Sequence, residues 1–484
     1  MIYSNIEFIV FYLSLLLLYS AIPNYRWRFS LLLIGSLIFY AWAGFADTLI
    51  FLFVVFFSWL SAAGARNFPR FKNQFLTLGI VVMLGHLFFW KYAPWVSSQI
   101  QLLYPQFLEG QKLVIPLPVG ISFFTLQGVA YLIDYRRGEV GYISMGQYLL
   151  FKSFFAQLVA GPIVRVKQLL PQLQILQTPN LEDFAVGASL FSLGFLKKIA
   201  LADKIAPIVD QIFAQPQNFN RGPLLLGVLG YTVQIWADFS GYTDMGRGCA
   251  RMLGINLPNN FLSPYFSRGP GEFWARWHIT LSTWIRDYIY IPLGGNRGSV
   301  IKTVGVLFLT MSISGLWHGA NWNFLIWGIY HGILLASERL IRPRIQFKMK
   351  STIFANLGIF INWVFVFGLI IFGWLIFRVQ QISDIPVFLS GIFGEQKGVD
   401  IFYPYAYHNI LFAFATCMGV QALFYNKDML EQPAWFKKLV SNRFLGWQSI
   451  SLGTTLGLTL ALLVILALVF RGQSEIRSFI YFQF

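Results

Sequence analysis

The stretch VGVLFLTMSISGLWHGANWNFLIWGIYHGILLASERL, residues 304–340, contains two long apolar runs separated by the short sequence Gly-Ala-Asn at 319–321. No charged residue occurs between Lys302 and Glu338. Each run approaches the roughly 20 residues that an α-helix needs to cross a bilayer. We therefore predict two spanning helices, at about 300–318 and 321–337.

The rest of the chain has the same character. Of its 484 residues 56% are hydrophobic and 12% are charged, whereas a soluble domain is typically about 25% charged. This composition excludes a soluble protein and predicts an all-α polytopic membrane protein with roughly 11 to 13 transmembrane helices. The remaining apolar runs lie at about 6–22, 28–44, 48–64, 74–92, 119–134, 146–164, 186–202, 222–237, 354–377, 406–426 and 449–470.

The charge of the chain is strongly positive. Lys and Arg total 36 against 20 Asp and Glu, a net charge of +16. The positive charges cluster between apolar runs, for example at Arg26 and Arg28, Arg66 to Lys72, and Lys197 and Lys198. Short basic loops of this kind indicate cytoplasmic segments beside anionic lipid headgroups. We therefore expect membrane lipid, and no nucleic acid, as a partner.

Other features exclude several protein classes. Cys249 and Cys417 lie far apart with no Cys/His grouping, so neither a disulfide framework nor a metal site is expected. The positive charge near the N-terminus follows the apolar run, which indicates a retained first helix rather than a cleaved signal peptide. No repeat, low-complexity linker or long polar interval occurs, so we predict a single transmembrane domain over residues 1–484.

Residues 252–297 differ from the spans on either side. They mix aromatic residues, Gly, Pro and charge, as in LSPYFSRGPGEFWARWHITLSTWIRDYIYIPLGGNR. The arginines exclude a lipid-exposed span, and the Trp and Tyr density excludes a free solvated loop. Irregular backbone occurs at membrane depth only when it is buried in protein or lines a wet cavity. We predict re-entrant or interfacial helices that wall a cavity.

Histidines interrupt the two apolar runs at 304–340. His318 and His331 lie in otherwise uncharged hydrocarbon, where an ionisable group is costly and marks a functional site by default. The alternative is a neutral imidazole that binds a helix carbonyl and holds two helices together. The flanking residues favour a functional site, because small and amide residues permit a helix break and the approach of a ligand; these residues are Gly315, Trp317, Gly319 and Asn321.

Helical geometry separates these two histidines. On one continuous helix they would lie about 20 Å apart on different faces. They could act together only if the chain folds back at 319–321. His318, beside that break, is the better candidate for the reacting residue.

A third histidine, His278, lies in FWARWHITLSTWIRDYIY, with Asp287 one to three helical turns further on. It could support His318 by orienting a substrate, or it could belong to an interfacial aromatic belt. A buried neutral imidazole suits general-base chemistry, in which a hydroxyl loses its proton while it attacks a thioester. No GxSxG, HExxH or Walker motif offers an alternative chemistry.

The segment WADFSGYTDMGRG, residues 236–248, carries two more acids within an apolar region, Asp238 and Asp244. They could serve a proton or cation path. The alternative, which we favour, is that they pair with Arg247 or Arg251.

Several strings together resemble the membrane-bound O-acyltransferase family, in particular its alginate O-acetylation branch. They are PVGISFFTLQGVAYLIDYRRG (118–138), QLVAGPIVR (157–165), IWADFSGYTDMGRG (235–248), FWARWHITLSTWIRDYIYIPLGGNRG (273–298) and SGLWHGANWNFLIWGIYHG (314–332). The resemblance implies a helical ring around a central tunnel, with a catalytic core at about 119–340 and flanking helices at about 1–92 and 354–470. It implies that His318 is the catalytic histidine, that His278 is the second functional position and that His331 is an additional position of this branch.

The resemblance also implies an activity. An acyl thioester, acetyl-CoA as co-substrate, would donate an acetyl group from the cytoplasmic side, with no permanently bound cofactor. The acetyl group would cross the bacterial plasma membrane to an extracytoplasmic partner protein or polysaccharide, for O-acetylation of an alginate-like exopolysaccharide. Alternatives are D-alanyl transfer of the teichoic-acid type, a non-enzymatic polysaccharide transporter, or a scaffold in an export complex.

Overall fold

The structure is a computed structural model that describes residues 1, 3–107, 111, 113–159, 161–341, 352–394, 398–400 and 405–423. Within these ranges every regular element is helical, and the β-type pairing consists of one isolated bridge between Phe219 and Val399. The predicted all-α fold is therefore confirmed. The predicted span at 449–470 lies outside the described residues.

The chain divides into two compact units. The first comprises Met1–Phe195 and Tyr242–Pro258, and the second comprises Leu196–Gly241 together with the described residues from 259 to 423. That all 484 residues form one transmembrane domain stays a prediction.

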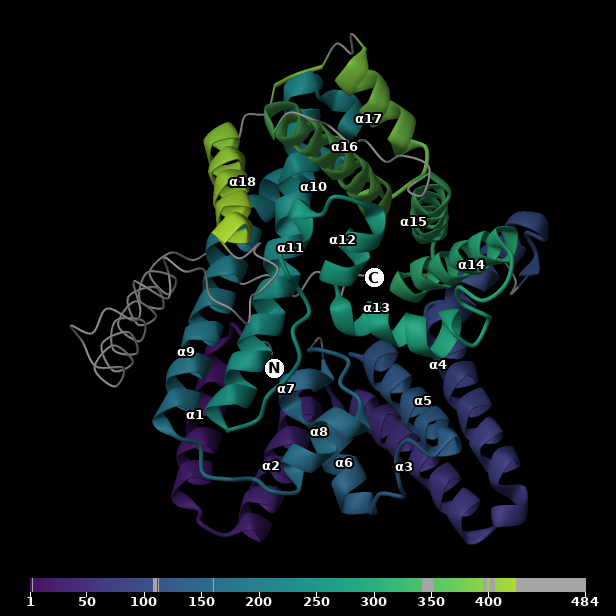
Figure 1. Ribbon diagram of the computed structural model, residues 1–484, viewed down its shortest axis with the longest axis vertical. Coiled ribbons are helices and arrows are strands. Elements are labelled where there is room, and N and C mark those ends of the chain that lie inside the picture. Colours follow the sequence, from purple (N-terminus) through teal and green to yellow (C-terminus); the bar gives the residue numbers. More distant parts are fainter. Residues whose placement is uncertain are drawn as a thin grey trace. The chain divides into compact units, whose positions relative to one another are not determined.

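The first unit is built from helices that mostly follow the predicted runs (Figure 1). Helices α3, α4 and α5 pack together, and α1 packs against α2. The elements are α1 (Ile6–Ala21), α2 (Tyr25–Ala41), α3 (Phe45–Asn67), η1 (Pro69–Phe71), α4 (Lys72–Leu103), α5 (Ile121–Arg137), α6 (Met145–Ser153), α7 (Phe155–Leu158), α8 (Val166–Leu173) and α9 (Leu181–Leu196).

One predicted span of this unit is wrong. The run at 146–164 is not a continuous helix, because α6 ends at Ser153 and only the four-residue α7 follows. The backbone N–H of Phe155 donates to Ser36 Oγ at 3.3 Å instead of to a helical carbonyl. Further along, Pro162 disfavours a helical conformation at the residue before it.

The prediction that Arg28 belongs to a basic loop beside lipid is also wrong. It lies in α2 with 3% of its surface exposed. Its guanidinium donates to the carbonyls of Ile22 at 2.6 Å and Leu176 at 3.0 Å, and to Thr178 Oγ1 at 2.6 Å. Because the guanidinium donates its hydrogen bonds within the protein, Arg28 connects α2 to the segment between α8 and α9 and does not bind lipid headgroups.

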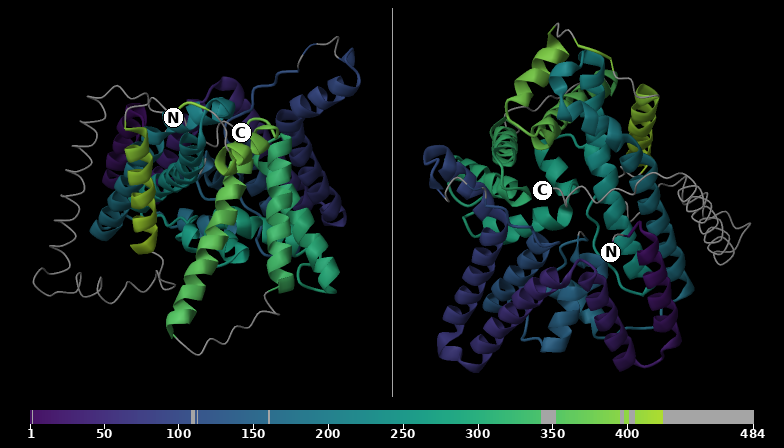
Figure 2. Two further views of the ribbon diagram at one scale, coloured as in Figure 1. Left: turned by 90° about the horizontal axis from the view of Figure 1, so that it is seen from above. Right: turned by 180° about the vertical axis from the view of Figure 1, so that it is seen from behind.

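The second unit contains most of the motifs that carry chemistry. Helix α15 packs against both α14 and α16 in it (Figure 2). The elements are η3 (Lys197–Asp203), α10 (Lys204–Ala214), η4 (Pro216–Asn218), α11 (Arg221–Met252, whose last residues belong to the first unit), η5 (Pro264–Phe266), α12 (Pro270–Arg276), α13 (Ile279–Ile285), η6 (Arg286–Tyr290), α14 (Val300–His318), α15 (Trp322–Ile341), α16 (Thr352–Arg378), α17 (Asp384–Phe393) and α18 (Ala406–Leu423).

The irregular stretch at 252–297 forms short helices, and its predicted re-entrant or interfacial placement beside a cavity stays a prediction. Its longest helices, α12 and α13, have seven residues each, far fewer than the roughly 20 that span a bilayer.

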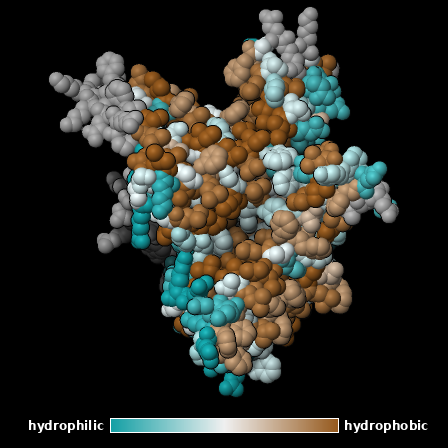
Figure 3. All heavy atoms as spheres, turned by 90° about the vertical axis from the view of Figure 1, so that its right-hand side faces the viewer, coloured by the Kyte–Doolittle hydropathy of each residue, from teal (hydrophilic) through white to brown (hydrophobic). Residues whose placement is uncertain are grey.

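The length, composition and exposed surface of the helices indicate a membrane protein. Six helices in the described part of the chain are long and apolar enough to cross a membrane, namely Phe45–Asn67, Pro69–Leu103, Leu181–Ala214, Val300–His318, Trp322–Ile341 and Asn356–Arg378. Large apolar side chains on such helices are exposed, among them Ile301 and Phe365. Apolar residues cover most of the face displayed in Figure 3. An apolar surface of this extent is suited to lipid and not to water.

Helices α14 and α15 form a tight hairpin because glycines face each other. A Cβ atom on Gly315 would lie 2.2 Å from the carbonyl oxygen of Phe324, and one on Gly328 would lie 2.3 Å from that of Met311. The sequence predicts that the small residues near His318 leave room for a ligand. At Gly315 the space is instead filled by the backbone of α15.

A second buried feature is an ion-pair triad in which Lys198 lies between two carboxylates. Its Nζ is 2.8 Å from Asp203 Oδ1 and 2.7 Å from Asp238 Oδ1. The predicted arginine pairing holds for Asp244, which binds Arg247 at 3.1 Å. It is wrong for Asp238, whose partner Lys198 comes from the π-helical turn η3. Lys198 is therefore buried within the protein and is not part of a lipid-facing basic loop.

Candidate functional site

His318 is the last residue of α14, at the point where the chain turns toward α15. Its side chain is 3% exposed. The imidazole meets the rings of Trp317, Trp327 and Phe377 edge-on, with centroids 5.0, 5.0 and 5.3 Å away. Edge-to-face contacts are the favoured geometry for aromatic rings, so these neighbours fix the orientation of the imidazole in an apolar environment.

His331 lies on α15 and is brought to the same place by the fold. The helix break at 319–321 is present, since α14 ends at His318 and α15 begins at Trp322. As a result Trp327 contacts both histidines, with its ring 5.0 Å from His318 and 4.8 Å from His331. Because the chain folds back at 319–321, His318 and His331 are close enough to belong to one site.

Helix α16 closes over His331 at a glycine. A Cβ atom on Gly373 would lie 2.9 Å from His331 Nε2. Any larger residue at this position would displace the imidazole, so the absence of a side chain at 373 helps to set the position of the ring.

His278 lies between α12 and α13 with no exposed surface. Its ring meets Phe239 edge-on at 4.7 Å and lies 6.1 Å from Trp317, which in turn contacts His318. The three histidines are thus linked through tryptophan rings, His278 through Trp317 and His331 through Trp327. His278 is outside the helices long enough to span the membrane, and burial lowers the pKa of its imidazole and favours the neutral ring.

The backbone at His278 is held in an unusual conformation. Its φ of 42° and ψ of 54° are left-handed, a conformation that costs a non-glycine residue about 1–3 kcal/mol and is concentrated at functional sites. Asn260 anchors the next turn, because its carbonyl accepts the N–H of Ile279 at 3.0 Å and its side chain accepts both the N–H and the hydroxyl of Thr280. These bonds hold the start of α13, and with it His278.

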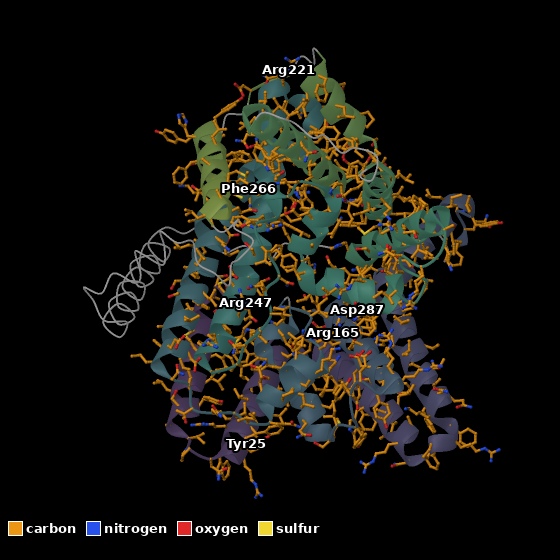
Figure 4. The ribbon with its side chains drawn as sticks, in the orientation of Figure 1. Tyr25, Arg165, Arg221, Arg247, Phe266 and Asp287 are labelled. Carbon is orange, nitrogen blue, oxygen red and sulfur yellow. The ribbon has the colours of Figure 1, made fainter. Side chains whose placement is uncertain are left out.

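The other predicted site residues divide into two groups. Trp317 contacts the rings of both His278 and His318, and its role in a functional site stays a prediction. Asn321 is exposed, and its Oδ1 accepts the N–H of Trp322 at 2.6 Å, which stabilises the first turn of α15. Asp287 lies in the π-helical turn η6 after α13 (Figure 4), where it binds the neighbouring Arg286 at 2.7 Å and raises the pKa of that guanidinium.

Several residues of this site escape sequence reasoning. The rings of Trp274, Trp327 and Phe377 contact the histidines, and Trp374 packs against Trp327. In the sequence these four look like ordinary aromatic residues of a membrane protein. Asn323 offered a signal, since an amide within an apolar run needs a partner. It donates to the carbonyls of Phe377 and Val379 at 3.1 and 3.2 Å, and so ties the end of α16 to the hairpin.

Metal-binding residues do not gather in the described part of the chain. No group of three or more His, Cys, Asp or Glu is placed there so that it could hold a metal ion. What the site contains is three buried imidazoles enclosed by aromatic rings, an arrangement suited to proton transfer out of contact with water.

Residues 71–378 match the membrane-bound O-acyltransferase (MBOAT) family. This is well over half of the chain and includes all three histidines of the site. The chain therefore belongs to the membrane-bound O-acyltransferase family, and it is an O-acyltransferase of the membrane.

Curated relatives cover similar stretches. The "Probable alginate O-acetylase AlgI" of Azotobacter vinelandii is 40% identical over 392 residues, 79% of this chain and 76% of that protein. The "Peptidoglycan O-acetyltransferase" of Helicobacter pylori is 34% identical over 67% of this chain and 65% of that protein. The "Teichoic acid D-alanyltransferase" of Streptococcus thermophilus is 32% identical over 47% of this chain and 58% of that protein.

Proposed function

We propose that this enzyme moves an acetyl group from a cytoplasmic thioester, acetyl-CoA, across the plasma membrane to an extracytoplasmic acceptor that serves O-acetylation of an alginate-like exopolysaccharide. The observation that carries the chemical part is the position of His318, buried among aromatic rings at the break between two membrane helices. The likeness to alginate O-acetylases supports the choice of acetyl group and polysaccharide.

In the proposed reaction, His318 acts as the general base. Its imidazole takes the proton of the acceptor hydroxyl as the oxygen attacks the thioester carbonyl carbon. The carbon–sulfur bond then breaks, and the same proton passes to the thiolate that leaves. The histidine ends the reaction in the protonation state in which it began. One histidine can therefore serve both proton transfers, first as the base and then as the acid.

His278 supports this reaction as a positioning residue in the proposal. It reaches His318 through the ring of Trp317. Its burial favours the neutral form, so it adds no repelling charge when His318 becomes protonated. The left-handed backbone conformation of His278, although costly, places its ring beside Trp317.

The partners follow from the same scheme. The acyl-thioester donor would arrive from the cytoplasm, and a partner protein or the polysaccharide itself would accept the acetyl group on the outer side. The site would need no resident cofactor or metal, since an activated thioester and a base are sufficient for acyl transfer. The enzyme would work as a multi-pass protein of the bacterial inner membrane.

D-alanyl transfer is the alternative within the enzyme class, because relatives named teichoic acid D-alanyltransferases match 45–47% of this chain. Mass spectrometry of the acyl group released from the polymer by mild alkali distinguishes acetate from alanine. A pure transporter would instead leave the polymer unmodified.

The test of the proposed function is His318→Ala in cells that make the polymer. We expect extracellular O-acetylation to be abolished while the amount of protein in the membrane is unchanged. His408→Ala is the matched control, because His408 is exposed on α18 and should be dispensable. Acetylation that survives in His318→Ala would show the mechanism to be wrong.

A further inference from the structure

Three tryptophans of the second unit, two of them in contact with histidines of the site, have buried indole nitrogens without a hydrogen-bond partner among the described residues. Trp274, Trp327 and Trp374, here called the indole cluster, come from α12, α15 and α16. Each side chain is at least nine-tenths buried. The Nε1 atom of each is buried and has no hydrogen-bond partner among the residues that the structure describes, and the same holds for Nδ1 of His331.

These four nitrogens belong to rings that are connected through contacts with Trp327. The ring of Trp327 lies 5.5 Å from Trp274 and 6.2 Å from Trp374. The ring of His331 lies 4.8 Å from Trp327 and 5.1 Å from Trp274. Trp327 also contacts His318 at 5.0 Å. The rings that carry these nitrogens therefore form one cluster, and Trp327 links this cluster to the proposed base.

Buried polar groups in proteins are nearly always hydrogen-bonded, so several exceptions in one place call for an explanation. Packing alone would be served by phenylalanine, which carries no N–H. An indole N–H can only donate, and a neutral imidazole nitrogen donates when it carries the ring proton. The partner missing from the three indoles must therefore be an acceptor, such as a carbonyl oxygen or an oxyanion, and His331 Nδ1 can bind the same acceptor in the tautomer that carries the proton there.

We propose that the indole cluster and His331 bind the acyl carbonyl oxygen of the thioester and stabilise the negative charge that develops on it during transfer. This inference rests on the proposed function and deepens it. As the hydroxyl oxygen attacks, the carbonyl π electrons move onto the acyl oxygen, and they return when the carbon–sulfur bond breaks. Donors in a dry aromatic environment stabilise such a charge strongly, and the rings around them suit the small methyl group of an acetyl unit.

Other occupants predict different behaviour. A water molecule held by the same nitrogens would stabilise the fold but would not contribute specifically to the transition state. Removal of one N–H would then change thermal stability and leave turnover intact.

The experiment removes the N–H groups and keeps the rings. Trp327→Phe and Trp374→Phe are compared with replacement of Trp327 by β-(3-benzothienyl)alanine, which keeps the bicyclic shape and has sulfur in place of N–H. Trp363→Phe is the matched control on α16, because Trp363 donates to the carbonyl of Tyr265 at 2.9 Å and has a partner in the fold. Membrane vesicles from polymer-producing cells receive labelled acetyl-CoA, and polymer-bound label is measured over a range of acetyl-CoA concentrations.

We expect the Trp327 replacements to lower kcat by on the order of 10²-fold with little change in KM, as for loss of one oxyanion donor. Trp363→Phe should retain its kcat. The inference is overturned if the benzothienyl variant keeps its kcat within about two-fold, whether its stability or its KM changes or not. His318→Ala measured in parallel separates the two proposals: an active His318→Ala refutes the proposed function, whereas an inactive one beside active tryptophan variants refutes the acyl-oxygen site alone.

Discussion

Gly315→Ala should loosen the hairpin that carries His318. The added Cβ would lie 2.2 Å from the carbonyl oxygen of Phe324 and 2.9 Å from the Cα of Gly328. Both are backbone atoms that no rotamer change can move. Ordinary van der Waals contact would require α14 and α15 to separate by about 1 Å.

The magnitude is best measured against Gly305→Ala on the same helix, where nothing lies within 4 Å of the added atom. Both variants gain about the same helix propensity, roughly 1 kcal/mol for Gly to Ala. Their difference therefore isolates the overpacking cost, about 1–3 kcal/mol. We expect Gly315→Ala to be the less stable of the two by this amount.

A thiol-reactive maleimide dye provides the assay. The chain has two cysteines, Cys249 in the first unit and Cys417 in the second, and both are buried and free. Each becomes reactive only when its surroundings open, so the dye reports thermal unfolding of the purified protein in detergent. We expect the midpoint temperature of unfolding to be highest for Gly305→Ala, lower for the wild type and lowest for Gly315→Ala. If Gly315→Ala melts together with or above Gly305→Ala, the close packing described for the hairpin is wrong.

A second readout concerns catalysis. His318 lies one turn beyond Gly315, and its contact partner Trp327 lies on α15. A misplacement of about 1 Å between reacting groups can cost on the order of 10²-fold in rate. We therefore expect Gly315→Ala to lose acetyl transfer even at temperatures where it remains folded.

Further predictions concern the other buried contacts. Gly373→Ala should displace His331, because its Cβ would lie 2.9 Å from Nε2 of that histidine. We expect it to lower acetyl transfer more than Gly368→Ala, whose Cβ would meet nothing within 4 Å. Equal rates in the two variants would show that the position of His331 is unimportant. Lys198→Met should destabilise the protein by about 3–5 kcal/mol, because it leaves the buried carboxylate of Asp238 and the partly buried carboxylate of Asp203 without their shared cation. The dye assay checks this value, and addition of Asp238→Asn should restore part of the loss; a Lys198→Met protein that melts like the wild type would contradict it.

The sequence alone was sufficient for the fold class. Charge depletion and apolar run length report directly on the solvent around a helix, so the spans near Phe45–Asn67 and Val300–His318 could be placed within a few residues. The break at 319–321 was also visible, because it lies between two apolar runs. Local composition failed at 146–164, where Ser36 on a distant helix accepts the hydrogen bond that would have continued α6.

The site divides in the same way. His278, His318 and His331 stand out in sequence, because an ionisable side chain in hydrocarbon is conspicuous wherever it occurs. Their grouping was decided by tertiary structure. The glycine-packed hairpin brings Trp327 between His318 and His331, and the Asn260 anchor holds the segment that presents His278 toward Trp317.

The partners of the charged residues were also beyond the reach of sequence. Asp238 binds Lys198 and not an arginine of its own helix, since a buried carboxylate takes whichever cation the packing brings within reach. The indole cluster gave no local signal either, because tryptophans are ordinary in membrane helices. Composition thus determined which solvent the helices meet, and only the packing of α12, α15 and α16 determined which nitrogens meet one another.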